Sequence, residues 1–190
     1  MIIIGITGTL GSGKGTVVKH LVGKYGFRHF SASDFIVDEL TLRGMPKTRD
    51  NMLMVANELR AKYSPSYIVE SLFQQAKEYG GNSVIESIRA IGEVKALKSK
   101  PGKFFLLAVD ADQKLRYQRV RGRKSSKDFI SFEKFQEDEK AEMNDPDPAK
   151  LNLSACITMA DALITNDSTP DRLRSEVDRI ATPLLAKDGR

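Results

Sequence analysis

The sequence of 190 residues predicts a three-layer α/β domain built on a five-stranded parallel sheet. Three observations indicate this fold class. Short apolar runs alternate with helical patterns along the chain, as in βαβ units. The run at 103–110 is nearly continuous, which is typical of a strand covered on both faces. The first run, 1–7, leads through a glycine-rich loop into a helix.

The strands are expected in five short apolar segments, which are 1–7, 27–30, 82–86, 103–110 and 162–165. A first helix follows at 16–25, and its apolar side consists of Val17, Val18, Leu21 and Val22. Residues 34–79 show only helical patterns, which are broken near Gly44-Met45-Pro46 and again at Ser64-Pro65.

After the fourth strand we expect helices at 113–121 and 131–143, separated by the polar residues 122–128. Asp145-Pro146-Asp147-Pro148 ends the second of these, because proline cannot continue a helix. The last helix is capped by Ser168 or Thr169 and has Pro170 inside it. Its buried stripe is Leu173, Val177, Ile180 and Leu184. We therefore expect one domain over 1–190 with two helical excursions, at about 34–80 and about 120–145.

The composition is that of an ordinary soluble protein, with 41% hydrophobic and 29% charged residues. The single cysteine, Cys156, cannot form an internal disulfide, which agrees with a reducing compartment. The apolar start has no basic region and stops too soon for a signal peptide or a membrane span. The prediction is a cytoplasmic protein that does not enter a membrane.

The net charge of +5 is unevenly distributed. A stretch without acids holds seven basic residues, which are Lys114, Arg116, Arg119, Arg121, Arg123, Lys124 and Lys127. A solvated helix face, a nucleic-acid surface or a phosphate clamp would each explain the run. Aromatic residues do not interleave it beyond Tyr117, which counts against nucleic acid without excluding it.

The most specific motif is the P-loop pattern Gly8-Thr9-Leu10-Gly11-Ser12-Gly13-Lys14-Gly15-Thr16. It lies between a predicted strand and a predicted helix, as this motif requires. Its glycines let backbone N–H groups turn inward onto phosphate oxygens, and the start of the helix adds a positive dipole. Lys14 would supply a charge for the β- and γ-phosphates. We therefore predict that residues 8–16 bind ATP together with Mg²⁺.

Gly15 departs from the usual pattern, because a serine or threonine normally follows the lysine and here Thr16 comes one position later. Mg²⁺ would then be held largely by phosphates and water, which it tolerates well. Thr16 and, through water, Glu86 at the end of the third strand are the protein groups that we expect near the metal.

Gly-Ser-Gly-Lys-Gly-Thr at 11–16 resembles the loop of adenylate kinase and other nucleoside monophosphate kinases. Further segments are similar in order and spacing, namely Ser31-Ala32-Ser33-Asp34, Glu86-Ser87-Ile88-Arg89, Val109-Asp110, Gln118-Arg119-Val120-Arg121-Gly122-Arg123 and Asn166. The chain also looks like a group of small kinases that stand between adenylate kinases and dephospho-CoA kinases. The resemblance covers most of the chain. It departs in the lid, where arginines of the family are replaced by Lys124, Lys127, Lys134 and Lys140.

The resemblance implies a role for each segment. Residues of about 34–80 would form the monophosphate-binding lobe and those of about 120–145 a short lid. Arg119 and Arg123, four residues apart, would close over the donor phosphates, and Asn166 would lie near the adenine. The acceptor would be bound by Arg89 at its phosphate, with further contacts from Ser33, Asp34, Arg43 and Arg60. For Arg43 and Arg60, a surface ion pair is the alternative.

Asp34 separates two chemistries. A monophosphate acceptor is already anionic and needs no base, whereas a hydroxyl acceptor such as dephospho-CoA needs a carboxylate, for which Asp34 is the candidate. Asp34 would otherwise cap the following helix. His20 and His29 are weak candidates for any role, and His29 is expected to be a packed strand residue.

The prediction that follows is an ATP-dependent phosphotransferase acting on a small nucleotide, a nucleoside monophosphate kinase. Hydroxyl phosphorylation of the dephospho-CoA kinase kind is the first alternative, although the His-Pro pair of those enzymes is absent. A regulatory P-loop ATPase without a small-molecule acceptor is the second.

Overall fold

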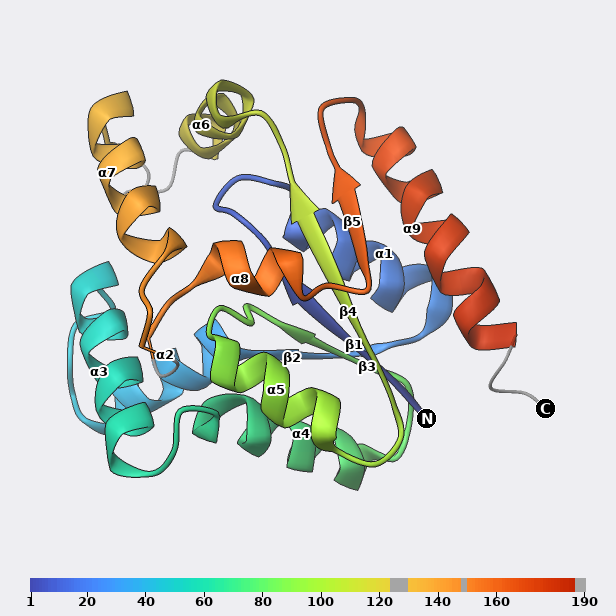
Figure 1. Cartoon of the computed structure of the whole chain (residues 1–190), viewed down its shortest axis with the longest axis horizontal. Coiled ribbons are helices and arrows are strands. Elements are labelled where there is room, and N and C mark those ends of the chain that lie inside the picture. Colours follow the sequence, from blue (N-terminus) through green and yellow to red (C-terminus); the bar gives the residue numbers. More distant parts are fainter. Residues whose placement is uncertain (124–129, 148–149, 187–190) are drawn as a thin grey trace.

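The computed structural model describes residues 1–123, 130–147 and 150–186, and it confirms the predicted fold class (Figure 1). Five parallel strands form one sheet in the order β2-β3-β1-β4-β5. Their bounds are β1 Ile2–Thr7, β2 Arg28–Ser31, β3 Ser83–Glu86, β4 Lys103–Asp110 and β5 Ala162–Thr165. Each strand lies within one residue of its predicted segment at either end.

The helices cover both faces of this sheet (Figure 1). Their bounds are α1 Lys14–Tyr25, α2 Ala32–Leu42, α3 Arg49–Lys62, α4 Tyr67–Tyr79, α5 Ile91–Ser99, α6 Gln113–Gly122, α7 Phe132–Met143, α8 Leu153–Thr158 and α9 Pro170–Ala186. The sequence did not predict α5 and α8. Both are short, and their apolar residues are fixed by packing rather than by a long periodic pattern.

The alternation of side chains along β1 divides the core into two layers. Ile2, Ile4 and Ile6 face a cluster that includes residues of α1 and α9. Ile3 faces the other cluster, which includes residues of α2, α3, α4, α5 and α8. Because both faces of the strand are buried, it reads as a continuous apolar run rather than an alternating one.

One predicted core position is wrong. Val22 was placed on the buried side of the first helix, but it is 40% exposed, whereas Val17 and Leu21 are fully buried. The buried side of α1 is narrower than predicted because the helix packs mainly against α9 and β3. In the last helix, Leu173 and Val177 are buried, and Ile180 and Leu184 are half-buried against the same cluster.

The two helical excursions begin at the carboxyl edge of the sheet. Helices α2, α3 and α4 fill the first, and their breaks fall at the glycine and proline positions predicted from the sequence. Helix α6 continues through Gly122 into the predicted polar break. Residues 124–128 of that break, which include Lys124 and Lys127, lie outside the described ranges. Naming these excursions an acceptor lobe and a lid remains a prediction. Among the residues described, no helix is long and apolar enough to span a membrane.

Candidate active site

The loop between β1 and α1 is shaped by glycines that no other residue could replace. Gly8 has a φ of +132°, and a Cβ there would lie 1.9 Å from the carbonyl oxygen of Val109. Gly13 has a φ of +106° and precedes α1, and its Cβ would lie 2.4 Å from Nδ2 of Asn166. Packing against the protein itself therefore demands these glycines. Gly15 is different, because a Cβ there would meet nothing within 4 Å.

Lys14 begins α1 and turns back over the loop. Its ammonium donates hydrogen bonds to the carbonyl oxygens of Gly8, at 2.9 Å, and Thr9, at 2.7 Å. Burial, with the charges of Arg89 and Arg123, lowers the pKa of Lys14 to about 7, although nearby carboxylates oppose this. Three cations from separate segments therefore act on one another at the mouth of the loop.

Arg89 follows β3 through a turn with unusual backbone geometry. Ser87 has a φ of +73°, in the left-handed region that non-glycine residues rarely adopt. The N–H of Ile88 then donates to the carbonyl oxygen of Ile6 on β1, at 3.2 Å. This turn brings Arg89 out at the carboxyl edge of the sheet, where its Nη1 lies 3.2 Å from Oε2 of Glu142.

Glu86, the last residue of β3, lies next to His29, which was expected only to be a packed strand residue. Nε2 of His29 is 3.1 Å from Oε2 of Glu86. Burial acts to raise the pKa of Glu86, but the contact with His29 and the charges of Lys14 and Arg89 outweigh it and hold the pKa below its ordinary value. Glu86 is therefore a charged carboxylate beside the P-loop lysine.

The two arginines of the predicted lid are both associated with the site. Nη2 of Arg119 lies 3.4 Å from the carbonyl oxygen of Ser168, and its Nη1 is buried without a hydrogen-bond partner among the described residues. Arg123 is the C-cap of α6, is exposed, and affects the pKa of Lys14. A buried N–H without a partner is costly, so the free Nη1 of Arg119 is a donor available to an anion.

Asn166 lies behind the loop rather than in front of it. The side chain is 5% exposed, and its Nδ2 donates a 2.7 Å hydrogen bond to the carbonyl oxygen of Ser12. The contact joins the loop after β5 to the P-loop. The structure therefore makes Asn166 a support of the loop, and its position near the adenine stays a prediction.

Arg43 and Arg60 are held by carboxylates within the helical excursion. Arg43 pairs with Glu39 at 2.8 Å and with Glu58 at 2.6 Å on the surface. Arg60 is 5% exposed and pairs with Glu93 at 2.9 Å. The surface ion-pair alternative therefore describes Arg43, whereas the ion pair of Arg60 is buried. The predicted contacts of both arginines with an acceptor stay predictions. The sequence alone did not identify Glu58 and Glu93 as partners, because both come from other elements of the fold.

Asp34 lies in the first turn of α2 but does not cap it. Ser31 is the cap, since its Oγ accepts the N–H of Asp34 at 3.1 Å. The Asp34 side chain is exposed and, within the described ranges, has no ion-pair or hydrogen-bond partner. Its neighbour Ser33 donates from Oγ to Oγ of Ser87, at 3.3 Å, which ties this turn to the loop of Arg89.

Arg116 is a site residue that the sequence reasoning missed. It is 4% exposed, and its guanidinium donates to the carbonyl oxygens of Ala111 and Leu10. Its Nη2 also pairs with Glu139 of α7 at 2.6 Å. Arg116 therefore links the P-loop to α7 and is no part of a solvated basic face. The basic run at 114–127 gave no means of separating it from its neighbours.

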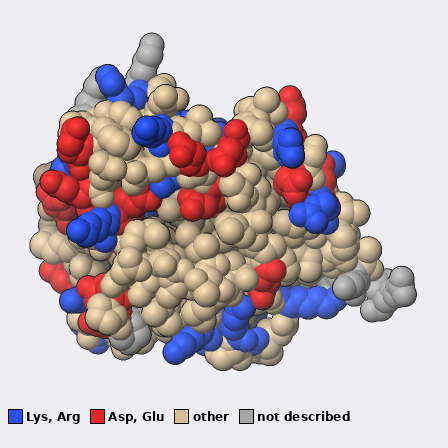
Figure 2. Space-filling view, turned by 45° about the horizontal axis from the view of Figure 1, so that its top comes forward, with Lys and Arg blue, Asp and Glu red and all other residues tan. Residues whose placement is uncertain are grey.

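Charge at this edge of the molecule is mixed. Figure 2 turns the top of the molecule forward and shows lysine and arginine side chains interleaved with aspartate and glutamate there, rather than one continuous basic patch. The ion pairs of α7 account for part of this pattern. Its Asp138 and Glu142 both pair with Arg49, at 3.2 and 2.8 Å.

The sequence profile of the family described as "AAA domain" matches residues 4–145, which include the P-loop, the helical excursion and α7. The chain belongs to the AAA domain family. A "UPF0200 protein" from Thermococcus sibiricus is 30% identical over 97% of this chain and 96% of its own length, so this AAA domain protein is also a UPF0200 family member.

Solved structures of kinases share the fold of this AAA domain protein. A gluconokinase from Sinorhizobium meliloti superposes with a TM-score of 0.57 at 15% identity, over 98% of this chain and 97% of its own. A shikimate kinase from Bacteroides thetaiotaomicron gives 0.56 at 14% identity, over 96% and 98%. At these identities the likeness establishes a P-loop kinase-like fold and nothing finer.

Proposed function

We propose that this protein transfers the terminal phosphoryl group of ATP to a nucleoside monophosphate. The observation that carries the proposal is the convergence of Lys14, Arg89 and Arg123 at the carboxyl edge of the sheet, where burial, together with the charges of the two arginines, lowers the pKa of the lysine to about 7. Phosphoryl transfer requires cations on both sides of an in-line path, with little covalent chemistry by the protein. Binding alone would not require an arginine outside the P-loop.

The donor side fits ATP with Mg²⁺. Residues 8–16 would hold the phosphates through backbone N–H groups, with Lys14 on the terminal phosphates. Arg119 and Arg123 would add charge as the lid closes. Thr16 and, through water, the charged Glu86 would hold Mg²⁺, whose role when bound is to neutralise the phosphate oxygens.

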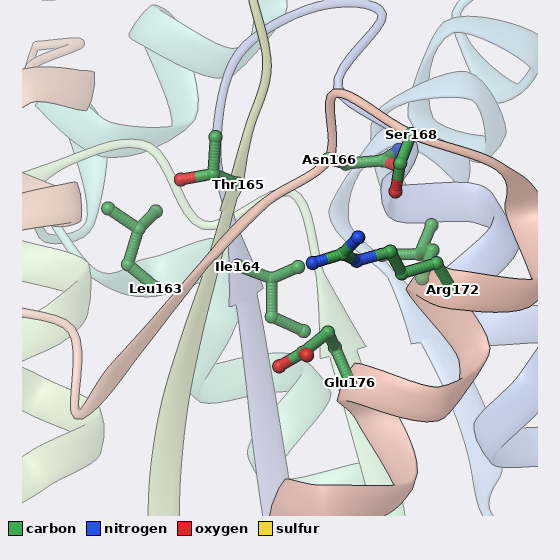
Figure 3. Close-up of a pocket in the computed structure, with 8 residues that line it drawn as sticks. Leu163, Ile164, Thr165, Asn166, Ser168, Arg172 and Glu176 are labelled. Atoms are coloured by element: carbon green, nitrogen blue, oxygen red, sulfur yellow. The ribbon is translucent and has the colours of Figure 1, made fainter.

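We assign the base of the donor to a pocket of about 140 Å³ between β5 and α9 (Figure 3). Ser168 and Arg172 line it, and Figure 3 shows the Arg172 side chain reaching across it towards β5. It adjoins Asn166, which contacts the P-loop. Ser168→Tyr should therefore raise the KM for ATP several-fold without weakening the binding of inorganic tripolyphosphate, which has no base. Equal losses for both would remove the assignment.

A hydroxyl acceptor is the second candidate, and Asp34 favours it. This carboxylate has no cation partner among the described residues, lies one residue from Ser33, and so is free to accept a proton. The gluconokinase and the shikimate kinase named above are, by their names, kinases of acceptors other than nucleotides.

One substrate panel tests these candidates. Purified protein with Mg-ATP should form a diphosphate from at least one ribo- or deoxynucleoside monophosphate. Hydrolysis of ATP with no diphosphate from any member would refute the proposal and favour a regulatory ATPase. Phosphorylation of dephospho-CoA or a polyol instead would establish the second candidate.

Arg89→Ala tests the acceptor side, with Arg43→Ala as the matched control. Arg89→Ala should raise the KM of the acceptor at least tenfold and leave ATP binding nearly unchanged. Arg43→Ala removes an arginine whose partners are Glu39 and Glu58, so it should change neither parameter. A loss of ATP affinity alone in Arg89→Ala would contradict the assigned role.

Asp34→Asn separates the two acceptor chemistries. A monophosphate kinase should keep most of its kcat, because its nucleophile is already anionic. A hydroxyl kinase should lose about 100-fold or more, the usual range for general-base catalysis. The substitution removes no contact that the described residues make, so the fold is expected to persist.

A further inference from the structure

Two arginines from different elements bind one carboxylate beside the candidate active site. Arg49 is the first residue of α3, Arg89 follows β3, and Glu142 lies near the end of α7. Nη2 of Arg49 is 2.8 Å from Oε1 of Glu142, and Nη1 of Arg89 is 3.2 Å from Oε2. Each oxygen of the carboxylate thus accepts from a different guanidinium.

Arginines bind a phosphate group in the same way, with guanidinium groups donating to its separate oxygens. Guanidinium groups present planar donors that match the oxygens of carboxylates and phosphates equally well. Arg49 is 93 residues from Glu142 in sequence and Arg89 is 53 residues from it, so only the tertiary fold brings the three together. The Glu142 side chain is 15% exposed and the two arginines 42% and 30%, so solvent and small anions can reach the pair.

The cluster lies next to the phosphate-binding lysine. The charges of Arg89 and Glu142 both act on Lys14, the first lowering its pKa and the second raising it. An anion between Arg49 and Arg89 would therefore lie within reach of the charge of Lys14. The carboxylate of Glu142 lies between the two arginines, in the position that an acceptor phosphate bound by both would occupy.

We propose that Arg49 and Arg89 form an anion-binding subsite for the phosphate of the acceptor, and that Glu142 occupies it until that phosphate displaces the carboxylate. The inference rests on the proposed function and names the arginine and the glutamate that set the affinity for its acceptor. Displacement is feasible because partly exposed ion pairs are weak. A phosphate monoester carries a charge of about −1.5 to −2 at neutral pH, against −1 for the glutamate.

Displacement also has a structural consequence. Glu142 and Asp138 both tie α7 to Arg49, so the departure of Glu142 removes one of the two ion pairs that Arg49 makes with α7 among the described residues. Glu139, three residues before Glu142 on α7, remains paired with Arg116. Acceptor binding would thus loosen α7 from α3 while its link to the P-loop side persists.

The test measures the binding of inorganic phosphate by isothermal titration calorimetry, with all proteins carrying Lys14→Ala so that the P-loop lysine does not contribute. Glu142→Gln should bind phosphate about three- to tenfold more tightly than the parent, the range expected for removing weak competing ion pairs. Arg49→Ala should bind it at least about tenfold more weakly. Glu137→Gln, on the same helix but exposed, should match the parent.

Unchanged or weaker phosphate binding in Glu142→Gln would overturn the proposal, as would tight binding in Arg49→Ala. Glu142→Ala serves as a second variant, and circular dichroism confirms that each protein is folded. The assay needs neither ATP nor turnover. A failed substrate panel would therefore remove the kinase assignment while leaving this result to be judged separately.

Hydrogen exchange gives an independent readout of the displacement. Phosphate should speed the exchange of amides in α7 (Phe132–Met143) in the parent protein, because one link to α3 is lost. In Glu142→Gln the exchange should be fast already and should not respond to phosphate. Exchange in α7 of the parent that phosphate leaves unchanged or slows would refute the displacement.

Discussion

Glu93 is a residue whose loss should damage the fold strongly, because it satisfies four donors in the interior. The side chain is fully buried, and its Oε1 accepts from Nε and Nη2 of Arg60, at 3.3 and 2.9 Å. Its Oε2 accepts the backbone N–H groups of Arg89, at 2.8 Å, and Ala90, at 3.1 Å. It therefore joins α3 to the turn that carries Arg89.

Glu93→Ala leaves the buried Arg60 guanidinium without its counter-ion and two amides without an acceptor. Removing one partner of a buried ion pair costs about 3–5 kcal/mol. The orphaned amides add to this unless water reaches them. We therefore expect Glu93→Ala to lower the free energy of unfolding by about 4–5 kcal/mol, which is a large share of the roughly 5–15 kcal/mol by which domains are stable.

Arg60→Met should cost less than Glu93→Ala. Glu93 keeps its two backbone donors when the arginine is lost, so its charge stays partly compensated. The double variant Arg60→Met with Glu93→Leu should recover part of the loss, because an apolar pair of similar size is about as stable as a buried ion pair.

Urea denaturation followed by circular dichroism measures these free energies of unfolding. A loss below about 1 kcal/mol in Glu93→Ala, or a larger loss in Arg60→Met, would refute the reasoning. The kinetic readout is the acceptor KM, which should rise in Glu93→Ala because Arg89 is no longer fixed. A control of matched size in the core is Leu97→Ala on the same helix, which should lower stability without raising that KM.

Three further predictions follow from the titrating groups. With its pKa at about 7, Lys14 is about nine-tenths neutral at pH 8. Binding of Mg-ATP should therefore be coupled to the uptake of close to one proton by the protein at pH 8 and of almost none at pH 6. Calorimetry in buffers of different ionisation enthalpy measures this, and equal uptake at both pH values would contradict it. The unfolding free energy of the nucleotide-free protein should also rise between about pH 7 and 10.5, where the unfolded chain holds the Lys14 proton and the folded one does not; Lys14→Met should lose that slope. Burial, with the charge of Glu93, raises the pKa of Cys156 to about 12, so a thiol reagent at pH 8 should label it quickly only in urea, and rapid labelling of the folded protein would count against this.

The sequence alone determined those features of the protein that depend on residues close together in the chain. The run from Ile2 to Thr7 could only be a buried strand, the glycines at 8 and 13 could only form a tight turn, and the prolines and glycine of the first excursion ended its helices. The order of these local patterns along the chain then predicts the fold class. The P-loop was found for the same reason, since its function depends on neighbouring backbone groups.

The tertiary structure decided which charged residues face which. The sequence did not reveal that Arg60 pairs with the buried Glu93, or that Arg49 and Arg89 share Glu142. An ion pair depends on distance in space, and its partners here come from other elements of the fold. Helices α5 and α8 escaped prediction for a related reason, because helices of so few residues are stabilised mainly by what they pack against.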